Sequence, residues 1–171
     1  INGSGRAGTS DIMTCEACEF VDTFLKLYPD VAVILNIDAD HLDYFKTVDN
    51  IIKSFNKFCN NTTKAIIYNG DDENTVKAVS SVLGKEKITF GLSDKNDFYP
   101  ENIERINGMT TEFDLIHKGE KLIRLTVSVP GEHNILNALA ASAAAYYAGV
   151  TPSDIAENLK NFTGRSEERR V

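Results

Sequence analysis

The sequence predicts an α/β protein: a mostly parallel sheet flanked by helices, with a small antiparallel β appendage. Between residues 31 and 90, short apolar runs alternate with segments of helical periodicity. This alternation is typical of parallel strands joined by right-handed crossovers. From residue 97 to residue 129, apolar residues alternate with polar ones between glycine turns, which predicts antiparallel hairpins packed beside the main sheet.

The parallel strands are predicted from short runs of apolar, mostly β-branched residues. Residues 31–35 form a continuous run of this kind, which predicts a central strand covered on both faces. Similar runs predict strands at residues 65–68 and 87–90. A shorter candidate strand occupies residues 11–15.

Four helices are predicted from apolar periodicity and from local start signals. Residues 48–59 have apolar side chains at helical spacing, and another such stretch follows Asp72. The alanine-rich residues 132–148 predict a long helix that ends at Gly149. Thr151 and Pro152 are typical of an N-cap and a first helical position, so a short final helix is expected.

The composition is that of an ordinary soluble domain and argues against several partners. The 171 residues are 42% apolar and 25% charged, with a net charge of −7. An acidic surface disfavours nucleic-acid binding. No apolar run reaches the ~20 residues of a membrane span. The odd count of three cysteines favours a reducing, cytoplasmic setting.

A dense group of polar side chains directly follows the predicted strand at residues 31–35. In open α/β sheets, ligands bind at the carboxyl ends of the strands. One imidazole, several carboxylates and an amide would suit Mg²⁺ or Mn²⁺ and a phosphorylated ligand there. A solvated turn whose aspartates cap the next helix remains an equal alternative. The residues of this group are Asn36, Asp38, Asp40, His41 and Asp43, and Glu16 and Glu19 could share the crevice with His41.

A second candidate site lies in the first turns of the long helix. His133, Asn134 and Asn137 are spaced so that Asn137 shares a helix face with each of the other two. An asparagine amide can donate and accept in one plane, which matches the N6/N7 edge of adenine. The alternative is structural: Asn134 caps the helix and Asn137 makes a core hydrogen bond. A phosphate-binding G-x-x-x-x-G-K-[ST] loop is not found in these 171 residues.

Four motifs in order resemble the central, ATP-binding domain of the Mur ligases, which build the peptidoglycan stem peptide. They are EACE at residues 16–19, TFLKLYP, NIDADHLDYF and VPGEHNILNALAA. The resemblance covers about residues 1–164 and is closest to the members that join L-alanine to UDP-N-acetylmuramate. It implies a P-loop-like domain, here lacking its phosphate loop.

The resemblance also implies the chemistry. A carboxylate is phosphorylated by ATP, and an amino group attacks the acyl phosphate to form an amide. By motif match, Glu16 and His41 would be the catalytic residues that hold Mg²⁺. His133, Asn134 and Asn137 would bind the adenine end of ATP.

The chain departs from the family pattern at both ends. The family's UDP-binding N-terminal domain, its G-T-x-G-K-T loop and its C-terminal amino-acid-binding domain are expected outside this chain. Residues 165–171 are expected to be a non-native tail. The chain alone is therefore expected to be inactive. Three alternatives stay open: a stand-alone nucleotide-binding module without catalysis, another Mur-type amide ligase, and a metal-dependent phosphohydrolase.

Overall fold

The computed structural model describes residues 8–106, 108–162 and 164. Six strands form one sheet in the order β1-β2-β3-β4-β5-β6. The pairs from β1 to β4 are parallel, and β4, β5 and β6 pair antiparallel. The expected tail at residues 165–171 lies outside the described residues. The strands are β1 (Val31–Ile34), β2 (Ala65–Asn69), β3 (Glu86–Phe90), β4 (Phe98–Arg105), β5 (Thr111–His117) and β6 (Glu120–Val127).

The helices begin where the sequence places capping side chains. Thr47, Asp72 and Thr151 each accept a hydrogen bond from a backbone N–H of the first turn of α2, α3 and α5, as N-caps do. None of the helices in the described part of the chain has the length and apolar character of a membrane span. The helices are the 3₁₀-helix η1 (Phe20–Lys26), then α1 (Leu42–Phe45), α2 (Val48–Asn61), α3 (Glu73–Ser80), α4 (Glu132–Tyr147) and α5 (Pro152–Asn161).

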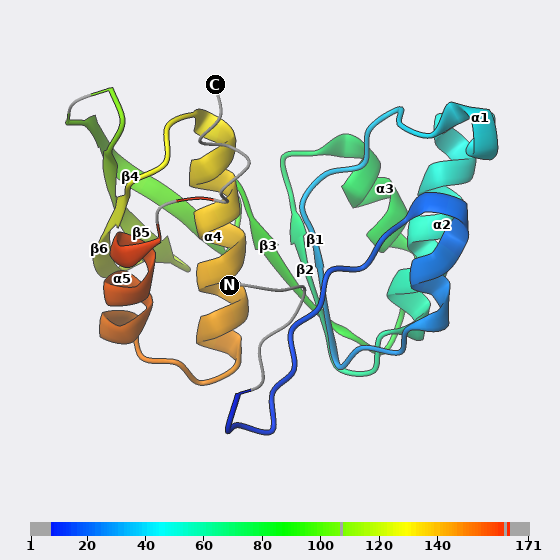
Figure 1. Ribbon diagram of the computed structural model, residues 1–171, viewed down its shortest axis with the longest axis horizontal. Coiled ribbons are helices and arrows are strands. Elements are labelled where there is room, and N and C mark those ends of the chain that lie inside the picture. The colour runs from blue at the N-terminus through cyan, green and yellow to red at the C-terminus, as the bar shows by residue number, and fades with distance from the viewer. Residues whose placement is uncertain (1–7, 107, 163, 165–171) are drawn as a thin grey trace.

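The helices cover the two faces of the sheet, so the core has two parts (Figure 1). On one face α4 and α5 pack on the strands around Ile67, Phe113 and Leu139. On the other face η1, α2 and α3 pack around Ile66 and its neighbours. Ile66 and Ile67 are consecutive in β2 and point to opposite faces, as strand geometry requires. Both are fully buried.

Three predictions about the strands need correction. Residues 11–15 have no regular secondary structure, and Ile12 and Met13 are exposed. A strand requires a neighbour for its backbone groups, and β1 pairs with β2 alone among the described strands. Among the described strands β1 is therefore an edge strand. Val33, which was expected to be covered, is exposed on one face of the sheet. The antiparallel strands are confirmed, but they continue the same sheet through the pair Phe90–Phe98 and do not pack beside it.

A buried carboxylate anchors the antiparallel strands. Asp114 on β5 accepts hydrogen bonds from Asn102 (3.0 Å), Lys121 (2.9 Å) and Arg124 (3.2 Å). Its side chain is only 6% exposed. The hydrogen bonds from Asn102 and Lys121, with that from Arg124, lower the pKa of Asp114 to about 2. In the folded protein Asp114 therefore stays charged at pH values near 4, where the same carboxylate in the unfolded chain is already partly protonated.

We expect Asp114→Asn to lower the free energy of unfolding at neutral pH by about 2 kcal/mol, because hydrogen bonds to a charged group are lost. A group whose folded-state pKa is lowered contributes stability above its unfolded pKa, near 4, and loses it as pH falls toward the folded value. Urea unfolding between about pH 5 and pH 2 should therefore show a steeper loss of stability for the wild type than for Asp114→Asn. Parallel pH profiles for the two proteins would contradict this role of Asp114.

Candidate cation and nucleotide site

The first candidate site lies where the chain leaves the carboxyl end of β1. After Ile34 the chain continues through a loop to α1. Ile37 is buried in that loop, and its carbonyl oxygen accepts a hydrogen bond from Asn74 of α3 at 2.9 Å. The loop is thereby fixed to the helical layer. It delivers Asp40 and His41 to the start of α1, where His41 is the N-cap residue.

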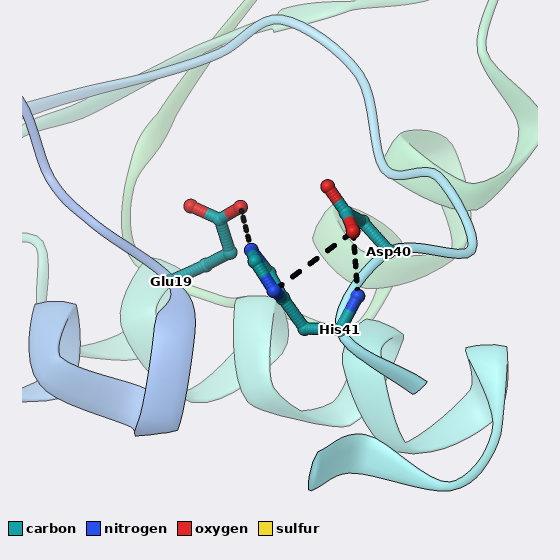
Figure 2. Close-up of side chains that lie close together, drawn as sticks. All are labelled: Glu19, Asp40 and His41. Carbon is teal, nitrogen blue, oxygen red and sulfur yellow. Dashed lines mark hydrogen bonds and ion pairs between the residues drawn. The ribbon is translucent and has the colours of Figure 1, made fainter. Parts of the chain in front are cut away.

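Three side chains meet at this point (Figure 2). His41 Nε2 lies 3.6 Å from Glu19 Oε1, and His41 Nδ1 lies 3.8 Å from Asp40 Oδ1. The backbone N–H of His41 donates to Asp40 Oδ1 at 2.7 Å. His41 has a φ of 52°, a left-handed conformation that is uncommon outside glycine. The imidazole therefore stands between two carboxylates that come from different parts of the chain.

The imidazole is also held on a further side. The ring of Phe20 lies 4.9 Å from the ring of His41, measured between centroids. Phe20 is the first residue of η1, and Glu19 is its N-cap. Two consecutive residues of one turn thus contact His41, one through an apolar ring and one through a carboxylate. About a third of each of the side chains of His41 and Glu19 is exposed, so the group is accessible from solvent.

The chemistry of this group fits a small divalent cation. One ligand atom from each of Glu19, Asp40 and His41 can be chosen so that all three lie within 4.8 Å of one another. Mg²⁺ uses few protein ligands, prefers carboxylate oxygens and retains several waters. Two carboxylates and one imidazole with an open, solvent-facing side satisfy that description. A structural zinc site would require four protein ligands of the nitrogen or sulfur type.

The two glutamates of the EACE motif have different surroundings. The sequence prediction assigned Glu16 to His41, whereas the contact that the structure brings to His41 is from Glu19. Glu16 is exposed and precedes η1 in a segment without regular structure. Its role as a metal ligand stays a prediction. Glu19, and not Glu16, directly precedes the turn in which Phe20 packs on His41, and this position brings the Glu19 carboxylate to the imidazole.

The other polar residues after β1 have local roles. The side chain of Asn36 donates to Asp38 at 2.6 Å, so these two pair with each other in the loop. Asp43 is exposed in the first turn of α1, where the helix dipole interacts favourably with a negative charge. The solvated-turn interpretation therefore describes these three residues, whereas His41 and Asp40 belong to the cluster.

The second candidate site, at the start of α4, is a connected set of side chains. The Asn134 amide nitrogen donates to the Pro130 carbonyl at 2.7 Å and lies 3.1 Å from His133 Nε2. Asn137 donates to the Asn134 side-chain oxygen at 3.3 Å. Asn134 is buried, whereas His133 and Asn137 are exposed. The predicted capping by Asn134 is wrong: the N-cap residue of α4 is Gly131, and the Asn134 side chain donates to a carbonyl before the helix instead of accepting from a first-turn N–H. Asn137 and His133 face solvent, where a ligand can reach them.

A hollow adjoins this second site. A cavity of about 180 Å³ lies before the first turns of α4, between the β6–α4 connection and the β4–β5 hairpin. Its lining includes Arg105, Pro130 and Glu132. The loop after β1 and the start of α4 lie at the same end of the molecule, toward the top of Figure 1. The two candidate sites therefore share one end of the sheet.

The sequence profile of the Mur ligase middle domain matches residues 7–145. Among curated relatives, the UDP-N-acetylmuramate–L-alanine ligase of Caldanaerobacter subterraneus is 39% identical over 166 residues, covering 96% of this chain. The enzyme of the same name from Caldicellulosiruptor saccharolyticus is 42% identical over 169 residues, covering 97%. This chain spans 36% and 37% of the lengths of those two relatives.

Solved structures agree with this match. The UDP-N-acetylmuramate–alanine ligase of Thermotoga maritima is 26% identical with a TM-score of 0.70, over 84% of this chain and 31% of that one. The MurF ligase of Thermotoga maritima, solved in complex with ADP, has the same fold at 21% identity and a TM-score of 0.64, over 80% of this chain and 32% of that one. The profile match covers most of the chain and the structural matches agree with it, so this chain belongs to the Mur ligase family and corresponds to its middle domain.

Proposed function

We propose that this chain is the middle part of an ATP-dependent ligase that joins L-alanine to UDP-N-acetylmuramate in peptidoglycan biosynthesis. The two relatives described above carry that name and match almost the whole chain. Within the site, the proposal rests on the contacts of His41 with Glu19 and Asp40. This cluster and the His133–Asn137 group lie at the same end of the sheet, as one bound nucleotide would require.

In the proposed reaction the γ-phosphoryl group of ATP passes to the carboxylate of UDP-N-acetylmuramate, which gives ADP and an acyl phosphate. The amino group of L-alanine then attacks the acyl carbon, phosphate leaves with the electrons of the C–O bond, and the nitrogen loses a proton. The P-loop and the domains that bind the two substrates are proposed to be supplied by the other parts of the longer protein. These assignments rest on the relatives' names and on the family.

The roles of this chain's residues follow from the two clusters. Mg²⁺, when bound, neutralises charge on the phosphoryl oxygens and aligns them for transfer. Glu19, Asp40 and His41 would hold that ion, with Glu16 as a further predicted ligand. Phe20 fixes the plane of the His41 ring. His133 and Asn137 would contact the adenine, and Asn134 orients both by its hydrogen bonds.

The experiment that tests the cation site compares the two glutamates. Mn²⁺ binding to the 171-residue chain, measured by electron paramagnetic resonance with ADP present, replaces Mg²⁺ by a spectroscopic probe. We expect Glu19→Gln to raise the Mn²⁺ Kd by about tenfold or more, equivalent to about 1.4 kcal/mol. Glu16→Gln is the comparison within the same motif and should raise the Mn²⁺ Kd less, because Glu19 contacts His41. Glu101→Gln, at an exposed glutamate of β4, is the matched control and should leave the Kd unchanged.

A larger rise of the Mn²⁺ Kd in Glu16→Gln than in Glu19→Gln would identify Glu16 as the metal ligand. An equal, unchanged affinity in both variants and in His41→Ala would show that the cluster does not bind a cation. Thermal melts of all variants check that each remains folded.

A further inference from the structure

One aspartate connects the two short helical turns that carry the cation cluster. Asp22 of η1 accepts a hydrogen bond from the hydroxyl of Tyr44 in α1, at 3.0 Å to Oδ2. Its other oxygen, Oδ1, accepts from the hydroxyl of Ser54 in α2. Ser54 is buried. Both carboxylate oxygens of Asp22 are thus used to join three elements.

Asp22 is coupled through the backbone to Glu19. The N–H of Asp22 donates to the carbonyl oxygen of Glu19 at 3.0 Å. Val21 and Asp22 have φ values of 54° and 57°, and a left-handed β-branched residue is a backbone outlier that surrounding contacts must maintain. The tight turn that results directs Glu19 toward the start of α1. The hydrogen bonds that the Asp22 carboxylate accepts from Tyr44 in α1 and Ser54 in α2 are the contacts that maintain this turn.

The other end of the connection leads to His41. Tyr44 lies one turn after His41, and its N–H donates to the His41 carbonyl oxygen at 2.9 Å. The helix α1 has four residues, and a helix so short has no stability of its own. The Tyr44 hydroxyl contact with Asp22 therefore fixes α1, and with it His41, relative to η1.

We propose that Asp22 is a positioning residue that sets Glu19 against His41 by joining η1 to α1. The proposal rests on the cation site proposed above. Cation affinity depends on ligands that are already in place, since each ligand that must be ordered on binding weakens it. Asp22 does not belong to the cluster of ligand atoms, so its effect on the cation is indirect.

The first test measures order without any metal. Hydrogen exchange of the backbone amides of η1 and α1 is compared in the wild type, Tyr44→Phe and Tyr28→Phe. Tyr44→Phe removes only the hydroxyl that contacts Asp22, and Tyr28→Phe is the matched control at an exposed tyrosine. We expect faster exchange in both η1 and α1 for Tyr44→Phe alone. Unchanged exchange in that variant would overturn the proposal, whether or not a cation binds.

The second test measures the Mn²⁺ Kd with ADP present. Tyr44→Phe and Asp22→Ala should each raise it about three- to tenfold, and the double variant should be no weaker than Asp22→Ala alone, because both changes break one connection. Additive effects would show that the two residues act separately. If Glu19→Gln weakens Mn²⁺ binding and Tyr44→Phe does not, the cation site stands and the positioning role is wrong. If no variant changes Mn²⁺ binding while Tyr44→Phe still speeds exchange, the cation site is wrong and the connection stands.

Discussion

His41→Ala, made in the complete ligase of which this chain would be the middle part, is expected to lower kcat for amide formation by about 10²–10³-fold. Removing one preorganised group that stabilises transferring charge costs a reaction that much, about 3–4 kcal/mol at 1.36 kcal/mol per decade. His41 is also the residue that both carboxylates of the cluster contact, so its truncation removes both of these contacts.

The measurement is the initial rate of phosphate release with saturating ATP, L-alanine and UDP-N-acetylmuramate, at several Mg²⁺ concentrations. A metal-ligand role predicts a higher Mg²⁺ requirement in His41→Ala as well as the lower kcat. His117→Ala is the matched control, because His117 stacks on Phe98 at 4.3 Å between ring centroids and does not belong to the cluster. A kcat reduced equally in both variants, with the Mg²⁺ dependence unchanged, would assign His41 a purely structural role.

Asn137→Ala is expected to raise the KM for ATP in the complete ligase by roughly ten- to a hundredfold. A bidentate pair with the adenine edge is worth about 1–3 kcal/mol, at 1.4 kcal/mol per decade. The protein should remain folded, because Asn137 is exposed, donates only to the Asn134 side chain among the bonds described for it, and alanine is the better helix former.

The same variant should lose much of the preference for ATP over GTP, since guanine presents an acceptor where adenine presents an amino donor. KM for both nucleotides is measured in the wild type and in Asn137→Ala, with a thermal melt of each. The matched comparison is Asn158→Ala in α5, an exposed helical asparagine whose amide donates to Asp154 in its own helix. An unchanged KM for ATP together with a lowered melting temperature would make Asn137 structural.

The secondary structure was largely readable from the sequence because its signals are local. The predicted strands at residues 65–68 and 87–90 agree with β2 and β3 to within one residue. The long helix predicted at residues 132–148 ends one residue earlier, at Tyr147. Periodicity and capping act between residues that are neighbours in the chain, so a sequence of this kind determines them without reference to the rest of the fold.

The second candidate site was also predictable in part. Spacing along one helix paired Asn137 with Asn134 and with His133, and the structure confirms the contact of Asn137 with Asn134, which is three residues away and needs helical geometry alone. The contact of His133 with Asn134 joins neighbouring residues and was not predicted from the spacing. Whether these side chains hold adenine depends on groups beyond the helix, and that assignment stays a prediction.

The sequence by itself determined the α/β class, the starts of the four longer helices α2 to α5, and the presence of a polar group after β1. The short helices η1 and α1 were not predicted. Only the tertiary structure decided that β1 lies at an edge of the sheet that the described residues form, because an apolar run does not reveal how many neighbours a strand has. It also decided which glutamate contacts His41. Glu16 and Glu19 belong to the same motif, and the choice depends on the left-handed turn at Val21 and Asp22. That turn is maintained by Tyr44 and Ser54, which lie 22 and 32 residues away from Asp22 in the chain, and contacts at such separations leave no local pattern in the sequence.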